Sequence, residues 1–135
     1  MTLGKALIVY GASLIAFLGI DAVWLTTMSD RFYRKQLGDL MRDDPDLGVA
    51  LAFYLLYVAG VLLLVVLPAA EKGSLLQAVG FGALLGVVAY GTYDITNLAT
   101  VRDWPAVVTA VDLVWGGTLT GAVSAVGYLI ARWVA

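Results

Sequence analysis

Histidine and cysteine are both absent from this sequence of 135 residues, and only 13% of its residues are charged. These absences exclude disulfides, thiol chemistry, zinc or iron sites built from Cys and His, haem ligation by those residues and histidine general-base catalysis. Eight Lys and Arg residues against ten Asp and Glu residues give a net charge of −2, so the chain has no basic surface for nucleic acid. We therefore expect no cofactor and no nucleic-acid partner.

Apolar residues are abundant instead: 61% of the chain consists of A, V, I, L, M, F, W, Y and C. Soluble domains average about 45–50% with glycine included, and about 25% of their residues are charged. A membrane-spanning helix needs about 20 mainly apolar residues, so this chain has room for four or five spans and no soluble catalytic domain. The composition predicts an all-α integral membrane protein.

Four apolar runs are long enough to cross a bilayer, and together they make one membrane domain over residues 1–135. The predicted spans are residues 4–28, 47–67, 75–98 and 105–133, which form a four-helix bundle. The first run could be a signal peptide, because Lys5 lies directly before its apolar stretch. It continues past Asp21 to Met28 without a clear cleavage site, which favours a retained helix.

Polar residues between the runs predict where helices begin and end. Ser74 and Gln77 have the spacing of a capping box at the start of the third span. Pro68 is expected to end the second span. Acidic residues followed by proline predict the starts of the second and fourth spans, at Asp44-Pro45 and Asp103-Trp104-Pro105.

The connection between the first two spans contains a short apolar stripe. Tyr33, Leu37, Leu40 and Met41 recur at helical spacing, which suggests an interfacial helix over residues 31–42. A solvated loop is an equal alternative, and Gly38 weakens the helix prediction. Three aromatic residues, Trp104, Tyr128 and Trp133, are expected to lie at the membrane interface.

The distribution of positive charge predicts an orientation. The side with the first and third connections carries Arg31, Arg34, Lys35, Arg42 and Arg102, and the other side carries Lys5, Lys72 and Arg132. Five positive residues against three weakly favour a cytoplasmic location for those two connections. Both termini are then expected outside, although insertion in both orientations is an alternative.

The sequence contains two pairs of similar segments, which we call internal echoes. When Asp21 is aligned with Asp94, identical residues recur at offsets of +4, +6 and +9, which suggests two duplicated helical hairpins or a coincidence in an apolar background. The second echo pairs Asp21-Ala-Val-Trp24 with Asp112-Leu-Val-Trp115. Those two spans run in opposite directions, so the second echo does not fit the same repeat.

Asp21, Asp94 and Asp112 are the only acidic residues within the spans. An aspartate at the centre of a membrane helix costs about 2.5–3.5 kcal/mol on insertion scales. Asp21 and Asp94 each lie nine residues before an aspartate at a helix end, and Asp112 lies nine residues after one. At 1.5 Å per residue each carboxylate is therefore roughly 13 Å from the same membrane face, so all three are predicted at one depth.

Further polar residues share helical faces with these aspartates. Tyr90, Tyr93, Asp94 and Asn97 fall on one face of the third span, and Asp112 belongs to a stripe of polar and small residues on the fourth. The predicted binding residues are Asp21, Trp24, Tyr54, Tyr57, Tyr90, Tyr93, Asp94, Asn97, Asp112 and Trp115. If the carboxylates converge, at least one is expected to be protonated unless a cation or Arg102 lies among them.

Several functions fit this pattern. The favoured hypothesis is binding or transport of a proton, a cation or a small solute, in an assembly such as a homodimer. The all-oxygen set would suit a hard cation such as Mg²⁺, but we expect no metal site, and the aspartates could instead act as polar glue between helices. A membrane enzyme acting on lipid or isoprenoid is an alternative, disfavoured because no Asp-rich phosphate-binding motif is present. A third possibility is an accessory subunit whose polar face points outward.

The run Tyr90-Gly-Thr-Tyr93-Asp94-Ile-Thr96-Asn97-Leu-Ala-Thr100, followed by Asp103-Trp104-Pro105 and Asp112-Leu-Val-Trp115-Gly116, has the pattern of a known family. The chain resembles small bacterial membrane proteins of four helices that are known only as a domain of unknown function. The resemblance extends over nearly the whole chain, from Ile20-Asp21-Ala-Val-Trp24-Leu25 onward. It implies the bacterial cytoplasmic membrane, with lipids as surroundings, and implies no activity.

Overall fold

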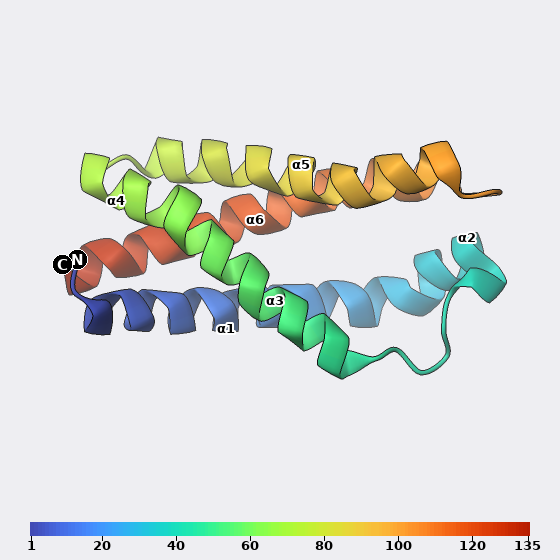
Figure 1. The fold of residues 1–135 in the computed structure, drawn as a ribbon, viewed down its shortest axis with the longest axis horizontal. Coiled ribbons are helices and arrows are strands. Elements are labelled where there is room, and N and C mark those ends of the chain that lie inside the picture. Colours follow the sequence, from blue (N-terminus) through green and yellow to red (C-terminus); the bar gives the residue numbers. More distant parts are fainter.

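A computed structural model describes all residues 1–135, and every element in it is helical (Figure 1). The long helices are α1 (Leu3–Met28), α3 (Leu47–Val61), α5 (Leu75–Thr100) and α6 (Ala106–Val134). With the short elements that continue α1 and α3, they form four segments long and apolar enough to cross a membrane. The predicted four-helix membrane fold is therefore confirmed, and the two chain ends lie side by side at one end of the bundle (Figure 1).

The first connection continues α1 as a series of short helical elements, which cover most of the predicted helix over residues 31–42. A π-helical turn, η1 (Ser29–Tyr33), leads into α2 (Arg34–Leu37) and a 3-10 turn, η2 (Gly38–Leu40). Gly38 has a φ of 55°, which most side chains disfavour, so the glycine that weakened the helix prediction marks the end of the α-helical part. The helical stretch bends over the end of the bundle that lies opposite the termini (Figure 1).

The second span is longer than predicted, because Pro68 does not end it. A π-helical turn, η3 (Leu62–Val66), joins α3 to α4 (Leu67–Lys72), and Pro68 lies in the first turn of α4. The N–H of Leu67 bonds to the carbonyl of Leu62, five residues back. This wider turn accommodates a proline that has no N–H and whose ring would press on a regular preceding turn.

The helix starts only partly follow the predictions. The Ser74 hydroxyl accepts a hydrogen bond from the N–H of Gln77 at 3.0 Å, but the N–H of Ser74 bonds to the carbonyl of Ala69, so only one half of the predicted capping box forms. Helix α3 is capped by Asp46, whose carboxylate accepts from the N–H of Val49 at 3.0 Å, and not by Asp44. Helix α6 starts after Pro105 without a side-chain cap, so the predicted acceptor before it is wrong.

Helix α6 is central, since it contains 13 of the 28 buried residues. Its small residues bring α5 close: a Cβ on Gly86 would collide with the backbone of Gly116, and one on Gly82 would collide with Ser124. Such close approach of backbones is the usual basis of helix association in lipid, where apolar burial gives little driving force. These contacts pack α5 firmly against α6.

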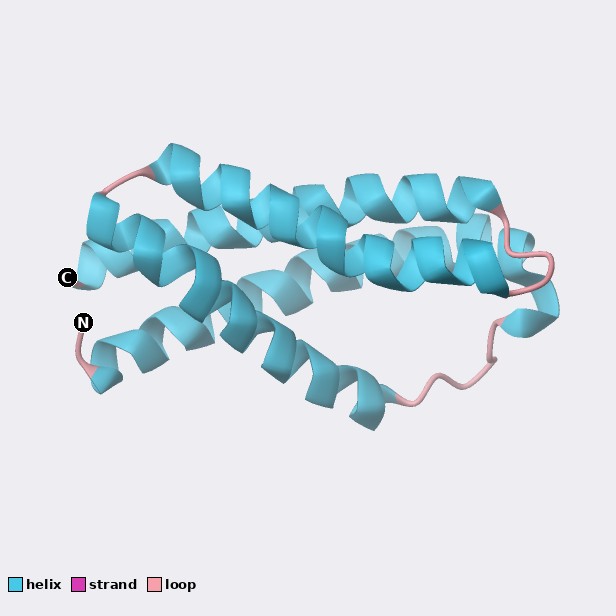
Figure 2. Ribbon diagram, turned by 45° about the horizontal axis from the view of Figure 1, so that its top comes forward, coloured by secondary structure: helices cyan, strands magenta, loops and turns pink.

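Helix α3 crosses the bundle obliquely. Its η3 and α4 end packs near α5 and α6, whereas its Leu47 end diverges from α5 (Figures 1 and 2). The Tyr10 hydroxyl of α1 donates to the carbonyl of Leu55 at 2.8 Å, which ties α3 to α1. The two hairpins predicted to be repeats are thus packed differently, and the bundle is more open at the end with the connections.

Candidate functional site

A cavity of about 380 Å³ lies at the connection end of the bundle, at the level of the aspartates. Two carboxylates and seven aromatic side chains contribute to its wall. The lining residues are Asp21, Trp24, Leu25, Ser29, Tyr33, Leu37, Met41, Tyr54, Tyr90, Tyr93, Trp104, Val108, Asp112 and Trp115. We call it the aromatic cavity.

Asp21 is held on both carboxylate oxygens. The hydroxyl of Tyr54 donates to Oδ2 at 2.9 Å, and Nε1 of Trp115 donates to Oδ1 at 3.2 Å. The donors come from α3 and α6, so this aspartate links three helices. It is 5% exposed, and its paired oxygens explain how a carboxylate is tolerated inside the bundle.

Asp112 is held on one oxygen only. The hydroxyl of Tyr33 donates to its Oδ1, and Nε1 of Trp24 donates in turn to the Tyr33 oxygen at 3.0 Å. The carboxyl of Asp94 also lies within hydrogen-bond distance of Asp112. No cationic side chain pairs with Asp112, so its charge has no counterion in the protein.

The two tryptophans explain the second sequence echo. Trp24 and Trp115 stack with ring centroids 4.2 Å apart and an interplanar angle of 7°. Because α1 and α6 are antiparallel neighbours, each Asp-x-x-Trp segment faces the other, and each tryptophan bonds toward the aspartate of the opposite helix: Trp115 directly to Asp21, and Trp24 to Asp112 through a tyrosine. The echo corresponds to a cross-helix pairing.

Asp94 is in a different environment. Its side chain is 0% exposed, and neither carboxylate oxygen accepts a hydrogen bond from an N–H or hydroxyl group; its polar neighbour is the carboxyl of Asp112, at hydrogen-bond distance. Asp112 lies beside it, and both residues line a second cavity, of about 480 Å³, between α3 and α5. Phe53, Tyr57, Ala89, Tyr90, Thr92 and Tyr93 complete the wall of this lateral cavity.

The three aspartates therefore do not form one ligand set. Asp21 and Asp112 share the aromatic cavity, Asp112 and Asp94 share the lateral cavity, and no group of three acidic side chains is placed to hold a metal ion. Arg102, the predicted counter-charge, is exposed in the turn before α6 and pairs with none of them. Neither cavity is lined by Lys or Arg.

The other predicted residues lie at various places around these cavities. Tyr90 and Tyr93 line both, whereas Tyr57 lines only the lateral cavity, where its hydroxyl is 2.9 Å from that of Thr120. Asn97 lines neither. The prediction that Tyr128 is an interface aromatic is wrong, because its side chain is 7% exposed and packs beside Ala69 and Ala78.

Sequence reasoning missed Tyr33 and Trp104 as cavity residues. Tyr33, Leu37 and Met41 belong to the stripe that predicted either an interfacial helix or a solvated loop, and in the structure they form part of the cavity wall. Their spacing identifies one helical face but not its neighbour. Trp104 donates to the Thr109 hydroxyl at 3.1 Å and so turns inward from the predicted interface belt.

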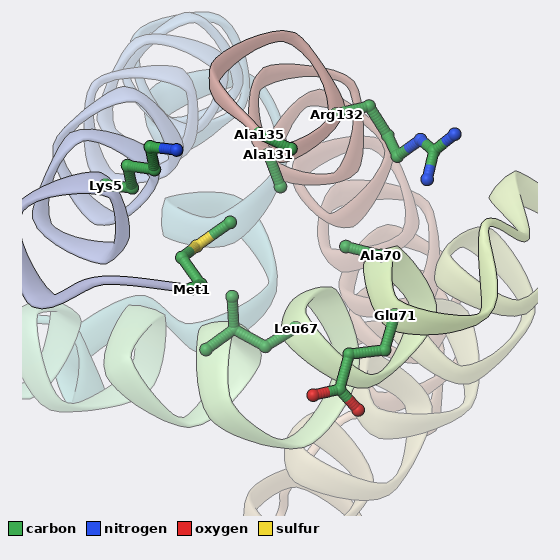
Figure 3. Close-up of a pocket in the computed structure, with 8 residues that line it drawn as sticks. All are labelled: Met1, Lys5, Leu67, Ala70, Glu71, Ala131, Arg132 and Ala135. Atoms are coloured by element: carbon green, nitrogen blue, oxygen red, sulfur yellow. The ribbon is translucent and has the colours of Figure 1, made fainter.

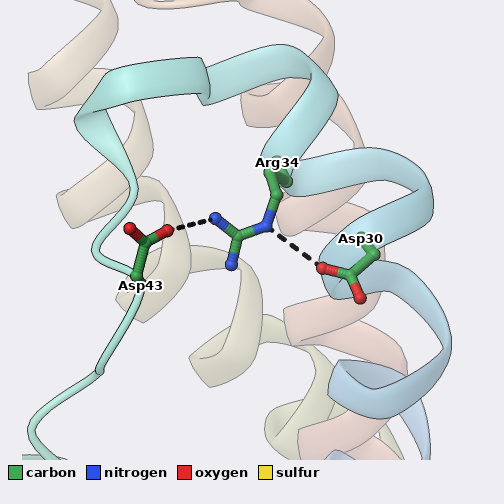
Figure 4. Close-up of polar contacts among 3 residues, drawn as sticks. All are labelled: Asp30, Arg34 and Asp43. Atoms are coloured by element: carbon green, nitrogen blue, oxygen red, sulfur yellow. Dashed lines mark hydrogen bonds and ion pairs between the residues drawn. The ribbon is translucent and has the colours of Figure 1, made fainter.

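Charged residues occur at the connection beside the cavity. Arg34 pairs with Asp30 at 3.1 Å and with Asp43 at 2.9 Å (Figure 4). A further pocket of about 500 Å³, which includes Arg34, Arg42 and Asp46, shares Ser29 and Met41 with the aromatic cavity. The aromatic cavity thus adjoins the polar surface of the connection end.

A separate pocket of about 490 Å³ lies at the opposite end, between the chain termini. Figure 3 shows Lys5, Glu71 and Arg132 around it, from three different helices. These side chains form no ion pair with one another, and no buried polar group lines the pocket. It has none of the features that make the aromatic cavity a candidate site.

Residues 6–129 match the family described as "Predicted membrane protein (DUF2177)", so the chain belongs to this family of membrane proteins of unknown function. The match confirms the family resemblance of the sequence. No curated protein and no solved structure shows a significant match to the chain. The site must therefore be interpreted from its own chemistry.

Proposed function

We propose that this membrane protein binds a small organic cation in the aromatic cavity, with Asp112 and Asp21 as the countercharges. One observation carries the proposal: two carboxylates and seven aromatic side chains line one cavity that has no Lys or Arg in its wall. Aromatic faces attract alkylammonium groups by about 0.5–2 kcal/mol each, most strongly where water is excluded. Uncompensated carboxylates in the same space favour a positive ligand.

The donor arrangement favours an organic cation over a metal ion. Hard cations such as Mg²⁺ or Ca²⁺ take six or more oxygen ligands. Here both oxygens of Asp21 and one of Asp112 already accept hydrogen bonds from tyrosine or tryptophan. A bulky, weakly hydrated ammonium group needs charge and aromatic surface without a full coordination shell, which is what this cavity offers.

The three aspartates also face inward. Asp21, Asp94 and Asp112 are all buried within the single chain. An accessory subunit that used this stripe to pair with a partner helix would present it on the outer surface. The inward arrangement supports a ligand site over a docking face.

The test is titration of the purified full-length protein with tetramethylammonium in dodecylmaltoside micelles. Trp24 and Trp115 line the cavity, so binding is expected to change the intrinsic tryptophan fluorescence. Asp112→Asn should weaken binding about thirtyfold or more, since removing one partner of a desolvated charge pair costs about 2–5 kcal/mol. Asp39→Asn, at an exposed connection residue, is the matched control and should leave the affinity unchanged.

Two results would contradict the proposal. One is the absence of any saturable fluorescence change in the wild-type protein, with binding by isothermal titration also absent. The other is equal affinity of the wild type and Asp112→Asn for tetramethylammonium, which would place the cation elsewhere.

We also propose that the membrane is the bacterial cytoplasmic membrane and that the connection end faces the cytoplasm. Its support is the excess of Arg and Lys at that end, together with the family resemblance. Because the chain has no native cysteine, Asp43→Cys and Glu71→Cys provide clean labelling sites at opposite ends. An impermeant maleimide applied to intact cells should label the Glu71→Cys variant only; labelling of the Asp43→Cys variant alone would reverse the orientation.

A further inference from the structure

We infer that the ligand is an amphiphile, whose cationic head occupies the aromatic cavity and whose alkyl chain leaves through the lateral cavity between α3 and α5. This inference rests on the proposed function and specifies the ligand class. The juxtaposition that supports it is the position of Tyr90, Tyr93 and Asp112, which line both cavities and so make them neighbours.

The lateral cavity opens toward lipid. Phe53 on α3 is 55% exposed and Tyr93 on α5 is 60% exposed, and both belong to its wall. These two helices diverge toward the connection end (Figure 2). Both cross the membrane, so the opening between them lies within the bilayer, where a hydrocarbon chain is the natural occupant.

The charges select the head group. Asp94 and Asp112 are the only charged residues in the lateral wall, and no positive residue is present in either cavity. A phosphate or carboxylate head would therefore meet only like charge, which costs several kcal/mol in a water-poor site. Fatty acids and anionic phospholipids are excluded, and an alkylammonium head is accepted.

Asp94 supports the same arrangement. Its buried carboxyl lies within hydrogen-bond distance of Asp112, so the two groups share a proton and carry one negative charge at the boundary between the cavities. No Lys, Arg or backbone N–H compensates that charge, and a buried charge without a counterion is costly unless it serves a ligand. A cationic head at Asp112 would also partly compensate Asp94.

The experiment compares a head group with and without a chain. Tetramethylammonium and decyltrimethylammonium are titrated into the full-length protein in dodecylmaltoside, with tryptophan fluorescence as the readout. Partition of the long-chain probe into micelles is the same for all variants, so only ratios between variants are interpreted. Ala89→Phe narrows the lateral cavity, and Ala52→Phe, at an exposed α3 residue that lines neither cavity, is the control.

Ala89→Phe is expected to raise the apparent Kd of decyltrimethylammonium about tenfold, equivalent to excluding two or more methylene groups. It should leave the Kd of tetramethylammonium within about twofold, which also shows that the variant is folded. Ala52→Phe should change neither. Phe53→Ala cannot overfill the cavity, and it should weaken decyltrimethylammonium about threefold through loss of wall contact without affecting tetramethylammonium.

Two patterns would overturn the inference while leaving the proposed function intact. In one, both cavity variants bind decyltrimethylammonium as the wild type does, although tetramethylammonium binds. In the other, both variants weaken the two probes equally, so that the lateral cavity does not hold the chain separately. If the wild type binds neither probe, the proposed function itself fails and the inference fails with it.

Discussion

The two ends of this bundle differ in the residue types that lie between their helices. At the terminal end, Val9, Val61 and Val66 form a buried cluster, and Gly127 allows Ser13 and Val66 to approach α6 within a distance that a Cβ would obstruct. At the connection end, the wall is made of tryptophan, tyrosine and aspartate, and the helices enclose cavities. Both ends must hold together in lipid, where apolar burial gives little driving force.

Stability and binding therefore depend on different contacts. Small residues allow backbone contact where helices pack closely, and the pocket of about 490 Å³ between the termini has no buried polar group in its wall. Large amphipathic rings at the connection end keep helices apart, while their N–H and O–H groups donate to Asp21 and to one oxygen of Asp112. Substitutions at the two ends should therefore affect different measurements.

The largest expected effect comes from breaking the packed contact at Gly86. Ala at this position would force apart the backbones of α5 and α6, because the added Cβ would collide with the Gly116 carbonyl. We expect a loss of about 3 kcal/mol or more in the free energy of unfolding, at the upper end of overpacking costs. Thermal unfolding in dodecylmaltoside, followed by tryptophan fluorescence, measures it.

Gly80→Ala is the matched control, since Gly80 lies on the same helix and a Cβ added there would meet no atom within 4 Å. It should stabilise α5 by roughly 0.5–1 kcal/mol, the helix preference of Ala over Gly. Equal melting temperatures of the two variants would mean that α5 and α6 are not packed as described.

Smaller changes in the free energy of unfolding are expected at the connection end, and they differ in sign between two aspartate variants. Asp21→Asn removes the carboxylate charge that accepts hydrogen bonds from two donors. The variant should lower the free energy of unfolding by about 1–2 kcal/mol. Asp94→Asn removes a buried carboxylate that has no donor, and should leave stability unchanged or raise it. The same thermal unfolding assay compares the two variants with the wild type.

If Asp94→Asn proved as destabilising as Asp21→Asn, Asp94 would have a bonding partner in the folded protein. The contrast between a paired and an unpaired aspartate would then be wrong. Asp39→Asn, at an exposed residue of the connection that forms no ion pair, controls for the loss of one charge.

The smallest effect is expected at Arg34, whose ion pairs lie on the surface. Its partners Asp30 and Asp43 have side chains that are 87% and 95% exposed. Arg34→Ala should cost less than about 1 kcal/mol, because exposed pairs contribute little and are screened by salt. Hydrogen exchange of residues 41–46 should become faster in this variant at low salt and match the wild type at about 1 M salt; a difference that persisted at high salt would contradict a purely ionic tether.

Much of this architecture follows from the sequence, because bilayer thickness fixes the length of each span. Burying an aspartate within a span is also unfavourable, so the few aspartates found there stand out. The number of spans was predictable from the required length. The course of the chain at Pro68 was not, because a π-helical turn that absorbs a proline depends on packing and leaves no pattern of its own. Alternative caps were also unresolved, since Asp44 and Asp46 lie two residues apart and either can accept a hydrogen bond.

The sequence predicts a common level for the site residues, but not how they divide between two cavities. Spacing along the helices predicts a level for Asp21, Asp94 and Asp112, but not the rotation that places Asp94 away from the aromatic cavity. Tyr33 was missed as a site residue because its contact with Asp112 spans 79 residues of chain. Trp24 and Trp115 were predicted to contribute to the site, yet only the antiparallel contact of α1 and α6 explains their echo.

Direct location of a bound cation tests whether a cation occupies the space between Asp21 and Asp112. Tetramethylarsonium has the shape and charge of tetramethylammonium, and its arsenic atom gives an anomalous X-ray signal. Crystals of the full-length protein grown with it should show one anomalous peak in the aromatic cavity, beside Asp112 and the ring of Trp24 or Trp115. A cavity without a peak at saturating tetramethylarsonium, or peaks confined to the exposed acidic residues of the first connection, would contradict the account.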